Sequence, residues 1–443
     1  MDSCQQDFYR KYAKNAVFAI WRYNKRAFLF AVCLFFIIFA DERKTQADKE
    51  MERFFQTHSF WMDHTKTSVR RALMDSIDWS YRLIGIRGAR GVGRTSFLLQ
   101  YAKENFDPNL HQCLFISMNN FYFQGRGIVD FAGTFVARGG QVLLIDQMFK
   151  LQNWKEQLLE CYRRYPHLRI IFTTTSVPDS EEENSELSAI CRFYNLHGFS
   201  FREFLNQQTG NDFRACSLSE IIKDHELLMK SILPKVRPWE YFQNYLHHGF
   251  YPFYIENRNF TESLLKAMNS MIETDILLSK QIELKYLPRI KKLLYLLAVS
   301  EESAPNVSKL AEEIGTSRAT VMNYLKYLEE GRFINLIFRE GDTFPKKPAM
   351  VRLHNTNLMY ALYSPNMDEQ SIYETFFVNS LWRHHQVNKG RRDGFYLVNE
   401  TTNVCVCDKL KRVKAPEDTF FARYNLEVGR GNDIPIWLFG FLY

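Results

Sequence analysis

A glycine-rich segment at residues 88–95 constrains the fold of this 443-residue chain more than any other feature. It reads Gly-Ala-Arg-Gly-Val-Gly-Arg-Thr and follows the apolar run at residues 83–86. It therefore fits the pattern GxxxxGK[ST], except that Arg94 replaces the lysine. In such a loop, backbone N–H groups converge on a phosphate at the start of a helix, where the helix dipole adds positive charge. The pattern predicts a strand, a phosphate-binding loop and a helix; a glycine turn without a ligand is the alternative.

The residues of this loop have separate predicted roles. Those expected to surround the phosphates are Gly88, Gly91, Val92, Gly93, Arg94, Thr95 and Ser96. The hydroxyl of Thr95 is expected to hold a magnesium ion that bridges the outer phosphates. A lysine ammonium is compact and fits between phosphates, whereas the guanidinium of Arg94 is a wide planar fork. We therefore expect phosphate binding to survive where hydrolysis does not.

A second apolar run, at residues 142–146, ends in Asp146. An acidic residue at the end of such a strand is expected to bind the nucleotide's metal, so Asp146 and Thr95 are the predicted Mg²⁺ ligands. Gln147 follows, where many ATPases of this type carry a glutamate that takes a proton from the attacking water. A glutamine orients that water but does not accept its proton. The alternative is that Asp146 only caps the next helix.

A third apolar run, at residues 168–172, is followed by Thr173, Thr174, Thr175 and Ser176. We expect it to lie beside the strand that ends at Asp146 in a parallel sheet. Thr174 is then a candidate catalytic residue, because a hydroxyl at this strand end is within reach of the outermost phosphate or the water. Hydroxyls at a strand end also satisfy local backbone groups, which is an equally good reading of this segment.

Together these segments resemble a family of prokaryotic AAA-type (P-loop) ATPases that is common in Bacteroides-like bacteria and archaea. The resemblance runs from about residue 51 to the end and rests on residues 88–95, 144–147, 165–173, 196–205, 245–253 and 436–441. It implies an α/β fold with a parallel-sheet core, a helical lid, a winged helix and a small α/β C-terminal domain like that of restriction endonucleases. It also implies ATP and Mg²⁺ as ligands.

Departures from the family pattern gather on groups that touch the phosphate or the water. Relatives usually have lysine at position 94, glutamate at position 147 and Thr-Gly-Ser-Ser after the third strand; the arginines that relatives carry before residue 196 are here Ala189 and Ile190. The chain is therefore expected to be a degenerate member, an ATP-binding conformational switch with impaired hydrolysis. Two alternatives stay open: an active ATPase, and a DNA-binding protein whose nucleotide core is only a scaffold.

The pattern along the chain suggests five parts. They are an N-terminal extension (1–50), the nucleotide-binding core (51–210), a helical lid (211–283), a winged helix (284–345) and the C-terminal α/β domain (346–443). Residues 307–325 have the spacing of a helix-turn-helix, with the turn at Gly315. Its second helix would present Arg318, Thr320, Asn323 and Lys326 to DNA. The alternative is a surface for an unidentified protein partner.

The C-terminal part retains little of a nuclease site. Glu374 and Asp393 match two metal-binding acids of the restriction-endonuclease-like pattern, but Cys407-Asp408-Lys409 stands where an acid-and-lysine pair is expected. A single carboxylate seldom holds magnesium against water, so nuclease activity is not expected. Cys405 and Cys407 alternate on one strand, where burial is more common than metal binding.

The first 50 residues contain a 14-residue apolar stretch at residues 27–40, which is short for a membrane span. We prefer Met51 as the true start; a membrane anchor in residues 27–40 is the alternative. The formal charge of +7 is mild and says little about nucleic acid. Eight cysteines with no pairing pattern fit a reducing cytosol, so the expected location is cytoplasmic.

Overall fold

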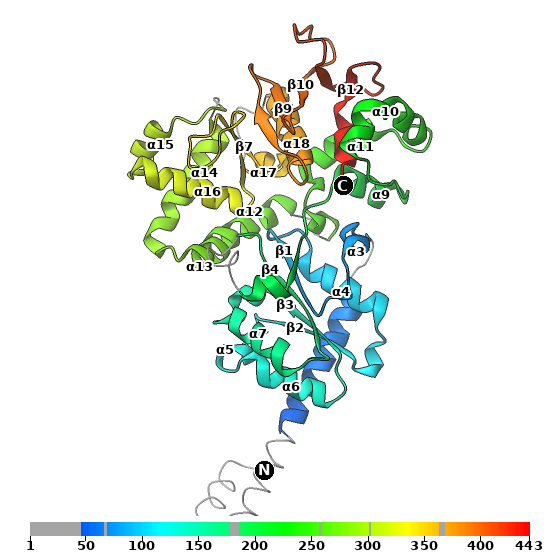
Figure 1. Cartoon of the computed structure of the whole chain (residues 1–443), viewed down its shortest axis with the longest axis vertical. Coiled ribbons are helices and arrows are strands. Elements are labelled where there is room, and N and C mark those ends of the chain that lie inside the picture. The colour runs from blue at the N-terminus through cyan, green and yellow to red at the C-terminus, as the bar shows by residue number, and fades with distance from the viewer. Residues whose placement is uncertain (1–45, 66–68, 178–185, 257–258, 301–302, 363–367) are drawn as a thin grey trace, which may run out of the picture.

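The computed structural model describes residues 46–65, 69–177, 186–256, 259–300, 303–362 and 368–443. In Figure 1 an α/β lobe, residues 46–200, lies below a second lobe that is built from the rest of the chain. The apolar stretch 27–40 lies outside the described residues. Within the described ranges, no helix combines the length and the apolar character that a membrane crossing requires.

The lower lobe is built on a five-stranded parallel sheet in the order β2-β3-β4-β1-β5. Its strands are β1 (Leu83–Gly88), β2 (Cys113–Ser117), β3 (Val142–Asp146), β4 (Arg169–Thr175) and β5 (Arg192–Asn195). Residues 142–146 are fully buried in β3, as their apolar run predicts. Strand β4 pairs with β3 in parallel, which confirms the predicted neighbour. The carboxyl ends of β1, β3 and β4 therefore meet at one edge of the sheet.

Helices cover both faces of this sheet (Figure 1). They are α3 (Leu73–Ser76), α4 (Arg94–Asn105), α5 (Tyr122–Gly125), α6 (Ile128–Ala137), α7 (Trp154–Arg164) and α8 (Glu186–Ile190), with short 3₁₀ turns η1 (Pro108–Leu110) and η2 (Met148–Lys150). Residues 46–64 are also helical, and Met51, Phe54 and Phe55 from them are buried in the core. Each face of the sheet has its own hydrophobic cluster.

The upper lobe has a second five-stranded sheet in the order β12-β11-β10-β9-β8, and a separate antiparallel pair, β6 and β7. The strands are β6 (Ile334–Ile337), β7 (Met350–Leu353), β8 (Val387–Lys389), β9 (Phe395–Val398), β10 (Thr402–Asp408), β11 (Phe420–Tyr424) and β12 (Asp433–Pro435). The sheet is mixed, because β10, β11 and β12 pair in parallel while β8, β9 and β10 pair antiparallel. The C-terminal α/β region is thus present.

Helices make up the remainder of the upper lobe. They are α9 (Phe201–Thr209), α10 (Leu218–Ile232), α11 (Pro238–Asn244), α12 (Phe260–Ser270), α13 (Leu277–Lys280), α14 (Leu287–Val299), α15 (Val307–Ile314), α16 (Arg318–Glu330), α17 (Thr356–Ala361) and α18 (Glu369–Leu381). The chain also forms π-helical turns η3 (Tyr245–Gly249) and η5 (Met271–Ile276), and 3₁₀ turns η4 (Pro252–Ile255), η6 (Leu284–Tyr286) and η7 (Ile436–Phe441).

The two hydrophobic cores of the upper lobe each contain residues from more than one of the five parts that the sequence suggests. One core joins apolar residues from 201–246 to those from 373–443. The other joins apolar residues from 250–298 to those from 307–361. The expected lid, 211–283, therefore contributes to both cores, because helical periodicity shows that a face is buried but not which partner buries it. The five-part division itself stays a prediction.

Residues 307–325 form two helices with the predicted turn at Gly315. Gly315 ends α15 with φ 65°, and the side chain of Ser317 accepts a hydrogen bond from the N–H of Thr320 to cap α16. Ala311, Ile314, Val321 and Leu325 are buried between the two helices and their neighbours. The strand pair β6–β7 follows these helices. The assignment of the segment as a winged helix stays a prediction.

Candidate functional site

The glycine-rich loop joins β1 to α4, as the motif requires. Gly91 and Gly93 have φ of 86° and 91°, a backbone region that residues with a Cβ rarely adopt. A Cβ on Gly91 would also stand 2.8 Å from the ring of Phe253. Gly93 precedes α4 without a side-chain cap, so the first N–H groups of the helix have no capping oxygen from that residue. The loop therefore has the geometry of an anion site.

A cavity of about 430 Å³ opens over this loop, a size typical of ligand sites. It is lined from the lower lobe by Gly91, Gly93, Arg94, Thr95, Ser96, Asp146 and Gln147, and from the upper lobe by Pro252, Phe253, Ile255, Glu256, Lys266, Ala267 and Ser270. Arg71 and Arg90 also line it, so cations outnumber acids. Gly88 and Val92, predicted to contact phosphate, line a separate cavity of only about 20 Å³.

The two predicted metal ligands lie in direct contact. The hydroxyl of Thr95 donates a hydrogen bond to Oδ2 of Asp146 at 2.9 Å, and the hydroxyl of Thr173 donates to its Oδ1 at 2.7 Å. Asp146 is 3% exposed, and both it and Thr95 line the cavity. Carboxylate and hydroxyl oxygens are the donors that Mg²⁺ prefers, with phosphate and water completing its octahedron. The donor set therefore fits a nucleotide-bound Mg²⁺.

Gln147 is fixed beside this carboxylate. Its backbone has φ 57°, and its N–H donates to the hydroxyl of Thr173 at 2.8 Å. Its side-chain nitrogen lies 3.4 Å from Oδ2 of Asp146. Its side-chain oxygen is buried and has no hydrogen-bond partner in the described part of the chain. An amide oxygen in this position accepts a hydrogen bond from water but does not take up the proton.

Thr173, and not the predicted Thr174, holds the cluster together. Successive side chains of a strand point to opposite faces, so only one of these neighbours faces Asp146. Thr174 lines a different cavity, of about 70 Å³, with Phe149 and Trp154. It contributes its backbone carbonyl, which accepts a hydrogen bond from Arg94. The run of threonines marks the strand end, but local sequence does not say which hydroxyl is used.

The guanidinium of Arg94 is buried against the end of β4. One of its nitrogens donates to the carbonyl of Thr174, and the residue is 8% exposed. Burial lowers the pKa of Arg94, while the carboxylates of Asp275 and Asp146 act in the opposite direction. Part of the hydrogen-bonding capacity of this side chain is therefore committed to the protein. A lysine would present its charge on one compact ammonium, whereas this guanidinium spreads its charge over a wide plane.

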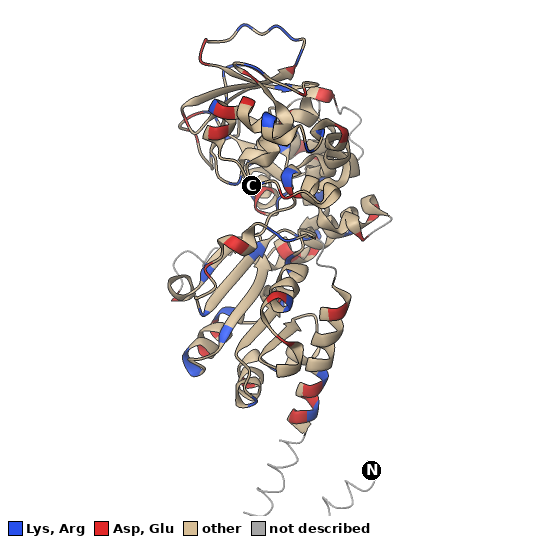
Figure 2. Ribbon diagram, turned by 90° about the vertical axis from the view of Figure 1, so that its right-hand side faces the viewer, with Lys and Arg blue, Asp and Glu red and all other residues tan. Residues whose placement is uncertain are grey.

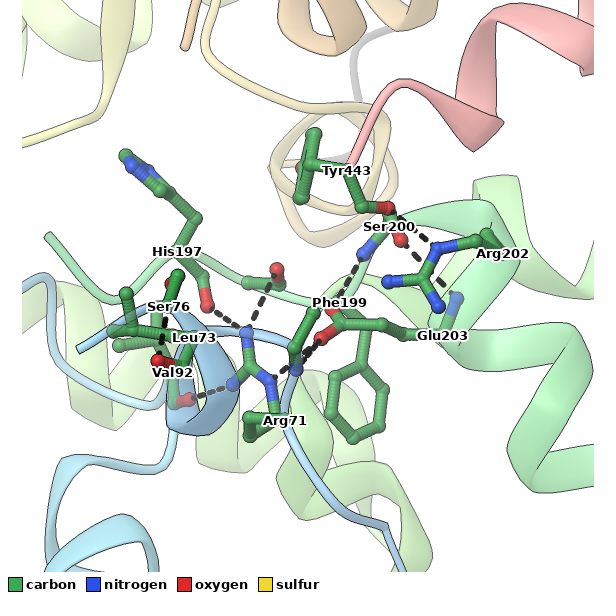
Figure 3. A network of polar contacts seen from close by, with 12 residues as sticks. Arg71, Leu73, Ser76, Val92, His197, Phe199, Ser200, Arg202, Glu203 and Tyr443 are labelled. Atoms are coloured by element: carbon green, nitrogen blue, oxygen red, sulfur yellow. Dashed lines mark hydrogen bonds and ion pairs between the residues drawn. The ribbon is translucent and has the colours of Figure 1, made fainter. Parts of the chain in front are cut away.

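Arg71, which no motif indicates, ties the loop to the upper lobe (Figure 3). It donates to the carbonyls of Val92 at 2.9 Å and His197 at 2.6 Å, and it forms an ion pair with Glu203 at 3.1 Å. Burial tends to raise the pKa of Glu203, but the charges of Arg71 and Arg202 outweigh it and hold that pKa below its usual value. Glu203 also caps α9. Contacts between residues this far apart in the chain produce no recognisable local pattern in the sequence.

A second cation of the loop, Arg90, contacts the other core of the upper lobe. Its Nε donates to Oδ1 of Asp275 at 2.8 Å. Asp275 lies on η5, is fully buried, and has a second oxygen without a hydrogen-bond partner among the residues that the structure describes. Position 90 is variable in the motif, so sequence does not predict this contact.

The four residues of α16 proposed for DNA contact differ in how exposed and how free of other contacts their side chains are. Arg318 and Asn323 are exposed on α16, and Thr320 is half-buried beside Ser317. Lys326 forms an ion pair with Glu329 at 2.8 Å. DNA contact through this helix therefore stays a prediction.

The predicted acids of the C-terminal region are engaged elsewhere. Glu374 is buried and accepts hydrogen bonds from Tyr396 at 2.7 Å, Gln370 at 2.8 Å and Arg352. Asp393 is exposed and pairs with Lys389 at 2.6 Å. Over the described ranges, no group of three or more His, Cys, Asp or Glu side chains is arranged to bind a metal. Cys405 and Cys407 are buried, as predicted. Glu374 and Asp393 therefore each have a protein partner.

Comparison with protein families bears on both lobes. Residues 80–205 match an AAA domain (AAA_14). The lower lobe has a P-loop AAA core. Residues 240–349 match a domain of unknown function (DUF8612), and most of that segment belongs to the single hydrophobic core that joins residues 250–298 to 307–361. AAA domains bind nucleotides, which fits the loop, the carboxylate and the cavity described above.

Individual relatives add little about activity. The chain is 25% identical over 275 residues to an uncharacterized protein of Methanocaldococcus jannaschii, covering 58% of this chain and 57% of that protein. Among solved structures, a RuvB variant of Thermotoga maritima has a TM-score of 0.25 and 15% identity, covering 66% of this chain and 89% of that one. C. elegans PCH-2 has a TM-score of 0.25 and 14% identity, covering 65% and 67%.

Proposed function

We propose that this chain binds ATP with Mg²⁺ in the cavity between the glycine-rich loop and the upper lobe, and changes conformation in response with impaired hydrolysis. The observation that carries this proposal is the contact of Thr95 and Thr173 with Asp146, because Thr95 and Asp146 line that cavity. It unites a hydroxyl from the loop, a carboxylate from the end of β3 and a hydroxyl from the end of β4. This is the set that a magnesium-bound triphosphate requires.

The residues divide the work of binding. The N–H groups at the start of α4 and the loop from Gly91 to Ser96 would hold the phosphates, helped by the helix dipole. Thr95 and Asp146 would hold Mg²⁺, which when bound supplies positive charge between the outer phosphates. From the upper lobe Lys266, which is largely exposed and pairs with Glu262 at 2.7 Å, lines the same cavity. Its ammonium supports an anionic ligand from the lid side.

Two features favour slow hydrolysis. Gln147 is fixed next to Asp146 with its side-chain oxygen directed into a buried, unpartnered position, so it orients a water but does not remove its proton. Arg94 uses one nitrogen on the carbonyl of Thr174, so its charge is shared between the protein and any phosphate. We therefore assign Gln147 an orienting role and expect binding to exceed turnover.

The link to conformation runs through Arg71 and Arg90. Arg71 joins the loop to Glu203, whose helix α9 packs in one core of the upper lobe, and Arg90 joins it to Asp275 in the other core. A phosphate in the loop attracts both guanidinium groups and competes with their carboxylate partners. Nucleotide binding would thereby change the position of both upper-lobe cores relative to the glycine-rich loop. The two ion pairs would couple the nucleotide site to each of the two cores separately.

The test measures binding and turnover side by side on the same protein. Calorimetric titration with ATP and Mg²⁺ should give saturable heat and raise the melting temperature. A steady-state phosphate-release assay should give little or no turnover. Clear turnover that disappears in Asp146→Ala would establish the active ATPase instead. No heat and no thermal stabilisation would leave the nucleotide core as a scaffold.

A further inference from the structure

A strongly basic surface lies at the far end of the upper lobe, away from the nucleotide cavity. It is formed by the turn between β8 and β9 and by the segment between β10 and β11, which reaches the top of Figures 1 and 2. We call it the basic tip and define it by six exposed cations: Arg391, Arg392, Lys409, Lys411, Arg412 and Lys414. The net charge of the whole chain is mild, so this concentration is a local feature.

The cations of the basic tip are not held in close ion pairs. None of the six forms a salt bridge with any residue that the structure describes. Neighbouring cations behave differently, because Lys389 pairs with Asp393 and Arg423 pairs with Asp433 at 2.7 Å. Like charges gathered on one surface repel one another, and an anionic ligand relieves this repulsion. The surface is therefore suited to a polyanion.

The basic tip also encloses a groove of about 540 Å³. Its lining includes Arg391, Arg392, Phe395, Asn403, Lys414, Pro416, Asp418 and Thr419. A hydrogen bond of 3.3 Å from Arg392 to the carbonyl of Lys414 joins the turn to the longer segment across it. Asp418, the one acid in this lining, accepts a hydrogen bond from Asn403 at 3.3 Å. The groove thus combines cations with a half-buried aromatic residue and an amide.

We propose that the basic tip binds single-stranded nucleic acid. Its cations would contact the phosphodiester backbone, and Phe395 and Asn403 in the groove would stack against and hydrogen-bond an unpaired base. A duplex presents its phosphates on a convex surface and keeps its bases stacked inside, so it does not use a recessed aromatic residue. An anionic membrane is bound by several exposed apolar side chains beside the charges. Within residues 409–414, Leu410 is the exposed large apolar side chain, so this surface fits a membrane less well.

This inference does not depend on nucleotide binding. The basic tip shares no residue with the cavity over the glycine-rich loop. It also differs from the predicted DNA contact through α16, where Lys326 is already paired. Failure of one proposal therefore leaves the other intact.

The experiment measures fluorescence anisotropy of a labelled 15-nucleotide oligothymidylate on the full chain without ATP. We expect binding that weakens with salt, with a log–log slope of about −0.7 for each phosphate contacted. The triple variant Arg391→Glu, Arg392→Glu and Lys414→Glu should weaken affinity at least about tenfold and flatten the slope by about 2. Phe395→Ala should weaken single-strand binding about fivefold or more with the slope unchanged, because it removes stacking and not charge.

Two controls separate this site from general electrostatics. Lys223→Glu, Lys230→Glu and Lys235→Glu together reverse three exposed lysines on and after α10 with the same change of formal charge. The double variant Arg318→Glu and Lys326→Glu reverses the two positive charges of α16 that were proposed for DNA contact. Both should bind the oligonucleotide like the unaltered protein, and circular dichroism should show that every variant is folded. The same assay with RNA distinguishes the two kinds of single strand.

Several outcomes would overturn the proposal. They are no binding at low salt, an equal loss in the α10 control, stronger binding to a duplex of the same length, and binding to phosphatidylserine vesicles in place of oligonucleotide. An unchanged affinity in the tip variant would also overturn it.

Discussion

Two buried acids, Asp146 in the lower lobe and Glu374 in the upper lobe, have opposite surroundings. Asp146 is held by the hydroxyls of Thr95 and Thr173 and faces a cavity. Glu374 is held by a guanidinium, a phenol and an amide inside a core. A carboxylate held by neutral hydroxyl donors keeps a negative charge that can attract a metal ion. A carboxylate held by an arginine has its charge balanced within the protein. Both acids fit metal-binding patterns in sequence, but their partners decide their roles.

The largest expected effect in this comparison comes from removing Glu374. Glu374→Ala leaves the guanidinium of Arg352 and the hydroxyl of Tyr396 buried without their acceptor. Loss of one partner of a buried ion pair costs about 3–5 kcal/mol of unfolding free energy. Chemical denaturation of the purified variant measures this value, with the exposed Glu369→Ala on the same helix as a control that should change stability by less than about 1 kcal/mol. Equal effects of the two variants would contradict a structural role for Glu374.

The next largest effect is expected from restoring the family residues at the nucleotide site. Arg94→Lys combined with Gln147→Glu supplies a compact cation and a proton acceptor beside Asp146. General-base catalysis contributes about 100-fold or more, so steady-state phosphate release should rise by at least about tenfold even if the geometry is imperfect. Addition of Asp146→Asn to this double variant should abolish the gain. No gain from the double variant, with ATP binding retained, would show that the site has diverged beyond these two positions.

A smaller effect separates two neighbouring threonines. Thr173→Val removes the hydroxyl that contacts Asp146 and the N–H of Gln147, so the affinity for ATP with Mg²⁺ should fall about tenfold, as expected when a buried charge-assisted hydrogen bond is lost. Thr174→Val keeps the carbonyl that binds Arg94 and should change affinity less than twofold. Calorimetric titration of the two isosteric variants provides the comparison. The reverse order would restore Thr174 to the role that the sequence suggests.

The sequence predicts what is local in this molecule. The glycine loop, β3 with Asp146, and the neighbouring position of β4 follow from short apolar runs and one motif. The sequence does not predict the ion pairs Arg71–Glu203 and Arg90–Asp275, because their partners are 132 and 185 residues apart and lie outside any motif. The split of residues 211–283 between two cores was missed for the same reason. Glu374 matches a metal-binding acid in sequence, but its partners Arg352 and Tyr396 come from other elements.

The last comparison concerns pH and two buried histidines, one in each lobe. His58 accepts a hydrogen bond from the N–H of Phe115 at 3.0 Å, and burial with the neighbouring His111 lowers its pKa to about 4. Burial and the charge of Arg332 lower the pKa of His354 to about 3. The unfolded chain takes up these protons near pH 6.5, so the stabilisation is complete above that pH and is lost as the pH falls toward about 4 for His58 and about 3 for His354. We expect a loss of about 1–3 kcal/mol for each histidine.

Denaturation of His58→Gln between pH 7 and pH 4.5 tests the lower lobe, because glutamine keeps an acceptor for Phe115 but does not titrate. Its stability should depend on pH less steeply than that of the unaltered protein, whereas the exposed His167→Gln should leave the slope unchanged. His354→Gln tests the upper lobe in the same way. Because the two histidines lie in separate cores, their effects should add. Unchanged slopes in both variants would mean that acid sensitivity arises from carboxylates such as Glu203, whose stabilising charge is lost only at lower pH.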